Sequence, residues 1–170
     1  MFGEKYDEMR LAGYENVYIR PLLMTGEFIQ PTVQIKITKE NELETLLDFA
    51  EKNNWVTDAL QLKRIMKPYV AVIVTDFNKT IIWVSSYFEK MTGYSSHEAR
   101  NQNPGFLQGE ETDVVTLKSI SKKINQKKTF KGSLINYKKS GETYTCHVEI
   151  VPVFDSLGRH VHYIAFETDR

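Results

Sequence analysis

The run Asn103-Pro104-Gly105-Phe106-Leu107-Gln108-Gly109-Glu110-Glu111-Thr112-Asp113 lies between an apolar hairpin pattern and a helical pattern rich in lysine. A second run, Ile135-Asn136-Tyr137-Lys138-Lys139-Ser140-Gly141, has the pattern of a strand that leads into a tight turn. The elements on either side of these two runs decide the fold class.

The order of the predicted elements is two strands, short helices, one longer helix and three strands, which is an α+β order. The apolar run 69–75 and the run 80–85 form a hairpin through the turn at 76–79. The later elements are short helices at 86–91 and 95–100, a helix at about 112–127, and strands at 129–138, 142–154 and 159–167.

This order and several local motifs resemble the PAS domain family, and within it the light-oxygen-voltage (LOV) branch. The motifs are Met91-Thr92-Gly93-Tyr94, the Phe106-Leu107-Gln108-Gly109 run with Glu111-Thr112-Asp113, and the turn that follows Asn136. The resemblance covers about 100 residues, from Tyr69 to the end of the sequence. It implies a five-stranded antiparallel sheet with short helices packed over one face, and it places the PAS domain at residues 68–170.

Residues 1–67 are expected to form a mainly helical N-terminal extension. Helices are predicted at about 39–53 and 57–66, the first from the spacing of Leu43, Leu46, Leu47 and Ala50. The stretch 14–36 carries no clear pattern and is expected to be loop and strand over the core. Because no Gly/Ser linker follows the extension, we expect it to pack against the domain. The extension resembles the leader of small stand-alone PAS proteins of bacteria.

The resemblance implies a flavin site between the sheet and the helices, and three amide side chains match it. Asn103 and Gln108 match the amides around the family's cysteine motif, and Asn136 matches the strand asparagine that contacts the flavin edge. With Cys146, these are the candidate pocket residues. An alternative for Gln108 and Asn136 is that they tie the loop to the sheet by hydrogen bonds to backbone groups.

Other positions depart from the flavin pattern. Pro104 stands in place of the photoreactive cysteine, so no thiol adduct can form by this route. Gly105 and Ser121 stand where the resemblance implies phosphate-binding arginines, and Glu167 stands where it implies a glutamine. Cys146 stands where a second amide is implied, and the alternation of its strand predicts a small core residue. No cofactor is therefore assigned.

The histidines give no metal site. His160 and His162 are predicted to share one face of the last strand, but no third ligand is evident, so an ordinary polar face is favoured. His97 lies near the position of the haem ligand in some PAS relatives.

Composition excludes several classes of protein. The sequence has 22 lysines and arginines and 22 aspartates and glutamates, so their charges balance. Nucleic acid and anionic membranes are therefore not expected partners. The single cysteine excludes an internal disulfide framework. No stretch approaches the ~20 apolar residues of a membrane helix, and the acidic N-terminus is unlike a signal peptide, so a cytoplasmic protein is expected.

The sequence therefore predicts a PAS sensory or adaptor module in signal transduction that binds a small ligand, a protein, or both, without an output domain of its own. It is expected to form a homodimer and to contact a signalling protein that the sequence does not identify. Enzyme motifs are absent, so no activity is predicted. The alternative is a flavin- or haem-loaded redox or gas sensor without cysteine-adduct photochemistry.

Overall fold

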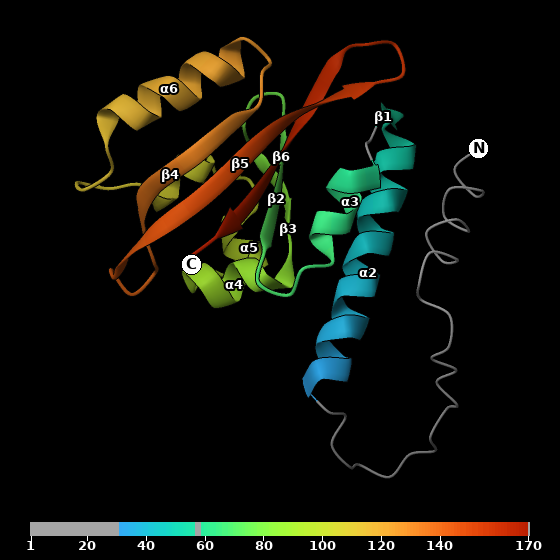
Figure 1. Ribbon diagram of the computed structural model, residues 1–170, viewed down its shortest axis with the longest axis horizontal. Coiled ribbons are helices and arrows are strands. Elements are labelled where there is room, and N and C mark those ends of the chain that lie inside the picture. Colours follow the sequence, from blue (N-terminus) through green and yellow to red (C-terminus); the bar gives the residue numbers. More distant parts are fainter. Residues whose placement is uncertain (1–30, 57–58, 170) are drawn as a thin grey trace. The chain divides into compact units, whose positions relative to one another are not determined.

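The core of the fold is an antiparallel sheet (Figure 1). The computed structural model describes residues 31–56 and 59–169. The predicted α+β PAS fold is confirmed, and the five predicted strands are present. These strands are β2 (Ala71–Asp76), β3 (Ile81–Val84), β4 (Phe130–Tyr137), β5 (Thr143–Asp155) and β6 (His160–Thr168).

A sixth, two-residue strand was not predicted. This strand, β1 (Trp55–Val56), pairs with the end of β5, where Trp55 lies opposite Asp155. The sheet order is β1-β5-β6-β2-β3, and β4 pairs with the first half of β5. Strand β5 is thus long enough to pair with β4 at one end and with β1 at the other.

Both faces of the sheet are covered, each by its own apolar cluster. Along β2, Ala71 and Ile73 face the first cluster, while Val72 and Val74 face the second. This two-sided burial explains why β2 reads as a nearly continuous apolar run. The first cluster lies under the helices between β3 and β4, and the second contains residues of the extension.

Short helices with well-formed ends cover the first face. They are α4 (Ser86–Thr92), α5 (Ser96–Ala99) and the 3-10 turn η1 (Pro104–Leu107), followed by the longer α6 (Val114–Asn125). Helix α4 ends at Gly93, whose φ of 78° is the left-handed conformation that glycine adopts readily. Ser95 and Glu98 form a reciprocal capping box on α5.

Helices α2 (Pro31–Lys52) and α3 (Ala59–Ile65) belong to the extension. Helix α2 begins earlier than the predicted 39–53, and its first residue is a proline, which the first turn of a helix tolerates because it needs no N–H there. The loop or strand expected for 14–36 is therefore wrong for 31–36, and the rest of that stretch lies outside the described residues. Leu46 and Ala50 of α2 are fully buried in the second cluster.

A buried ion pair within α2 is linked to helix α4 by a hydrogen bond. Lys39 Nζ lies 2.9 Å from Glu42 Oε2, and both side chains are almost completely buried. Glu42 Oε1 accepts a hydrogen bond from the backbone N–H of Ser86, the first residue of α4. The hydroxyl of Ser85 instead accepts from Val72 N, so Glu42 supplies the cap that Ser85 does not.

Strand β1 is held by an aromatic cluster. Trp55 is 2% exposed, and its Nε1–H donates to His162 Nδ1 at 2.9 Å. The ring of Phe49 packs edge-on against both rings. Because Nδ1 accepts this hydrogen bond, His162 is neutral with its proton on Nε2.

Candidate functional site

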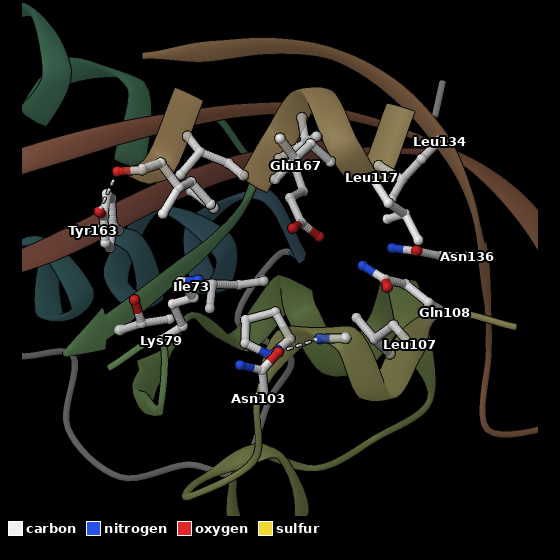
Figure 2. Close-up of a pocket in the computed structure, with 18 of the residues that line it drawn as sticks. Ile73, Lys79, Asn103, Leu107, Gln108, Leu117, Leu134, Asn136, Tyr163 and Glu167 are labelled. Carbon is white, nitrogen blue, oxygen red and sulfur yellow. Dashed lines mark hydrogen bonds between the residues drawn. The ribbon is translucent and has the colours of Figure 1, made fainter. Parts of the chain in front are cut away.

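A cavity of about 220 Å³ lies between the first face of the sheet and a roof formed by α6 and η1. Its apolar walls include Ile73 of β2, Val148 and Ile150 of β5, and Leu117 and Ile120 of α6. Figure 2 shows these surroundings. An apolar cavity with a few polar groups is typical of a small-molecule site.

Helix α6 is fixed at its two ends and rests on the cavity between them. Asp113 caps its first turn by accepting from Val115 N and Thr116 N, and Tyr163 Oη donates to Ile124 O at 2.9 Å near its end. Yet no residue of α6 is fully buried. Its apolar side chains Leu117, Ile120 and Ile124 line the cavity, so a guest would complete their burial.

The loop that carries Asn103 and Gln108 is tied to β4 by residues that the sequence did not single out. Thr112 Oγ1 donates to Ile135 O at 2.7 Å and accepts from Gly109 N. Tyr137 Oη accepts from Glu111 N at 2.9 Å. These hydroxyls make the contacts that were expected of the two amides.

Asn136 and Gln108 instead face the cavity. In the described chain neither amide hydrogen-bonds a backbone group across the loop and sheet, so that alternative is wrong. Asn136 is 5% exposed, and its Oδ1 has no hydrogen-bond partner among the described residues. The two amides point toward one another at one end of the cavity (Figure 2). A buried amide oxygen without a donor costs about 1–3 kcal/mol, which a ligand N–H or O–H would recover.

The candidate residues separate into two groups. Asn103, Gln108 and Asn136 line the cavity, although Asn103 is exposed and uses its Oδ1 to cap the η1 turn at Gly105 N. Cys146 is fully buried in the first cluster, as its strand alternation predicted, and is not among the residues that line the cavity. Burial, reinforced by Glu167, raises the pKa of its thiol far above the ordinary value. Cys146 is thus a core residue, and any role of the other three in binding stays a prediction.

Glu167 is a site residue that the candidate set omitted. It lies on β6, lines the cavity and is 6% exposed. Burial raises its pKa to about 7, a rise that the neighbouring Cys146 thiol partly offsets. Its Oε2 has no hydrogen-bond partner among the described residues. Its i, i+2 spacing from Ala165 and Tyr163, which also line the cavity, was the available sequence signal.

The cations of the family's phosphate site are missing at the expected positions. Gly105 and Ser121 both line the cavity and neither carries a charge. Lys79, in the turn between β2 and β3, is the one cation among the described lining residues.

The predicted common face of His160 and His162 is wrong. A β-bulge between Val153 and Phe154 interrupts the pairing of β5 with β6 at this point. His160 packs on Tyr163, with ring centroids 4.3 Å apart, whereas His162 packs on Trp55. Among the described residues no three His, Cys, Asp or Glu side chains gather as metal ligands would. No described helix is long and apolar enough to cross a membrane.

Comparisons with known proteins agree with this geometry. The family model described as "PAS domain" matches residues 70–170. A blue-light photoreceptor of Listeria innocua is 36% identical over 111 residues, which are 64% of this chain and 44% of that protein. A nitrogen fixation regulatory protein of Klebsiella oxytoca is 32% identical over 100 residues, 59% of this chain and 20% of that protein. The chain thus spans less than half the length of these relatives.

Solved structures show the same fold. A cysteine-to-valine variant of the fungal photoreceptor VVD is 27% identical with a TM-score of 0.55, and the match covers 58% of this chain and 75% of that one. A light-oxygen-voltage domain studied with a flavin analogue is 26% identical with a TM-score of 0.61, over 66% of this chain and 86% of that one. With the family model matching more than half of its length, the chain belongs to the PAS domain family.

Proposed function

We propose that this PAS domain is a sensory or adaptor module that binds a small molecule in the cavity beneath α6 and signals by contact with another protein. The observation that carries the proposal is the cavity itself. It combines apolar walls with two buried acceptor atoms, Asn136 Oδ1 and Glu167 Oε2, that have no partner among the described residues. Since each such atom costs free energy in the folded protein, a ligand that donates to them would stabilise the fold.

Native mass spectrometry of the purified protein tests this proposal directly. We expect a mass above that of the chain, and we expect the excess to disappear when the same sample is denatured. The matched control is Ala165→Phe, which fills the cavity from β6, since Ala165 lines it. A wild-type mass equal to the chain mass, together with no thermal stabilisation by any member of a metabolite library, would contradict ligand binding.

Partner contact is proposed to involve a homodimer. A ligand shifts a contact between proteins only through its different affinity for two states of the protein. The same native spectra report the subunit count. A monomer at every concentration, with and without ligand, would contradict the dimer and leave the cavity proposal standing.

A flavin-loaded sensor is the second candidate, because the relatives include blue-light photoreceptors and a solved neighbour was studied with a flavin analogue. The residues fit a flavin only in part. Asn103, Gln108 and Asn136 line the cavity, but Pro104 carries no thiol. Cys146 is the only cysteine and lies in the core outside the lining, so adduct chemistry does not fit this site.

An absorption spectrum of the freshly purified protein separates the two candidates. A flavin band that survives gel filtration would favour the flavin-loaded sensor, and a colourless protein would exclude it. A haem-loaded sensor has less support in the geometry. His97 lies on α5, is exposed and does not line the cavity.

A further inference from the structure

The cavity carries its two charged groups on separate walls. Among the described residues that line the cavity, only Lys79 and Glu167 have side chains that can carry a charge near neutral pH. Figure 2 shows Lys79 across the cavity from the amides of Asn136 and Gln108, with Glu167 of β6 between them. The cavity is therefore asymmetric in charge from one end to the other.

Lys79 is held in place by its backbone while its ammonium group keeps no acidic partner. Its φ of 70° is left-handed, and its N–H donates to Asp76 O at 3.0 Å within the turn. The nearby Asp76 carboxylate accepts from Thr80 N instead. No described carboxylate lies within ion-pair distance of Lys79 Nζ, and the side chain is half-buried. A partly desolvated ammonium beside a cavity attracts an anion.

The middle of the cavity and the end opposite Lys79 present acceptors. Asn136 Oδ1 and Glu167 Oε2 are more than nine-tenths buried and have no donor among the described residues. A ligand that brought a second acceptor to this end would leave Asn136 Oδ1 unpaired, because an amide oxygen can only accept. A ligand with an N–H or O–H at this end avoids that cost.

We propose that the cavity selects a small molecule with three features: an apolar body, an N–H or O–H donor that meets Asn136 and Glu167, and an anionic group that meets Lys79. This inference rests on the proposed function and adds the class of ligand to it. The anion contact would come from the turn between β2 and β3, and the uncharged Gly105 and Ser121 would take no part. The apolar body would pack against Ile73, Leu117 and Ile120.

Two fluorescent dyes of matched shape test the anionic group. The first is the anilinonaphthalene sulfonate isomer whose N–H and sulfonate lie at opposite ends of the naphthalene. The second is the corresponding phenylnaphthylamine, which has the same rings and N–H but no sulfonate. Because a charge-assisted hydrogen bond is worth about tenfold in affinity or more, the wild-type protein should bind the sulfonate that much more tightly.

Three substitutions assign that preference to residues. Lys79→Met should remove the preference and leave the affinity for the uncharged dye unchanged. Asn136→Leu should weaken both dyes by the same factor, about threefold to tenfold, because both use the N–H. Lys118→Met is the control: Lys118 is exposed on α6, does not line the cavity, and should leave both affinities unchanged.

The outcomes distinguish the two proposals. If both dyes bind with equal affinity, or if Lys79→Met keeps the tenfold preference, the ligand class is wrong while the cavity proposal stands. If neither dye binds, the ligand class is wrong, and the native mass spectra with the metabolite library decide the cavity proposal separately. Binding must also be lost in Ala165→Phe, or in Ile120→Phe on the roof if the first variant does not fold. If the dyes still bind to a folded variant whose cavity is filled, their site lies elsewhere on the protein and the inference is overturned.

Discussion

The substitution Glu167→Gln should change how the stability of this protein depends on pH. Glu167 lies on β6 with 6% of its surface exposed, and its Oε2 has no partner among the described residues. The titratable groups that face it are the Cys146 thiol and the Tyr144 hydroxyl, and burial keeps both of these protonated through neutral pH. Glutamine has nearly the same shape and cannot ionise, so the substitution removes only the titration.

The magnitude follows from the two protonation equilibria. Burial raises the pKa of Glu167 from its ordinary 4.5 to about 7. Between these values the folded state keeps the proton that the unfolded chain has released. The free energy of unfolding therefore falls as the pH rises through this window and levels off above the folded-state pKa. One unit of pKa is worth about 1.4 kcal/mol, so the whole decline is about 3 kcal/mol.

Urea unfolding at pH 5, 6, 7 and 8 measures this effect, with wild type and Glu167→Gln side by side. Relative to the variant, the wild type should lose most of that 3 kcal/mol between pH 5 and 7 and little more by pH 8. The comparison cancels the histidines, whose lowered pKa values act in the opposite direction. Glu110→Gln, at an exposed loop residue, is the matched control and should track the wild type. A wild-type minus Glu167→Gln difference that is the same at every pH would refute the reasoning.

Three further predictions concern the extension and the thiol. Trp55→Phe removes the N–H donated to His162 and should lower the free energy of unfolding by about 1 kcal/mol. Because burial lowers the pKa of His162, the contribution of this contact should be full above the ordinary pKa of 6.5 and fall as the pH drops below it, which urea unfolding of both proteins at several pH values, followed by circular dichroism, reports. Glu42→Ala leaves the Lys39 ammonium buried without its partner and should cost about 3 kcal/mol or more, part of which Glu42→Ala with Lys39→Met should restore. The buried Cys146 thiol should react with a thiol reagent only as fast as the protein unfolds, so rapid labelling of the native protein would contradict its place in the core.

Local patterns predicted the elements that local physics controls. The β-rich run at β2 and the alternation that buries Cys146 on β5 both appear in the structure where the sequence placed them. The short helix predicted at 95–100 also appears, as α5, and its capping box involves residues only three apart. Each of these features depends on neighbours in the sequence, so a pattern over a few residues contains the information.

The features that sequence reasoning missed depend on distant partners. Strand β1 has two residues and exists because the end of β5 offers it an edge, which no local pattern records. The hydrogen bonds of Thr112 and Tyr137 join the loop to β4, and predicting them would have required the position of β4 relative to that loop. His160 and His162 were assigned to one face because period-2 alternation assumes an uninterrupted strand, and a bulge breaks it.

Glu167 is an ionisable residue at a buried position of β6 where an apolar residue is expected, and such exceptions point to function. Alternation along β6 directs it inward with Ala165, where an apolar side chain would pack without an ionisation cost. A carboxyl with an unpartnered oxygen instead lines the same cavity as the unpartnered Oδ1 of Asn136. The fold tolerates this cost because the second apolar cluster, on the other face of the sheet, is complete without the cavity. A domain selected only for stability would fill this space, which is why we propose a guest that satisfies the polar groups.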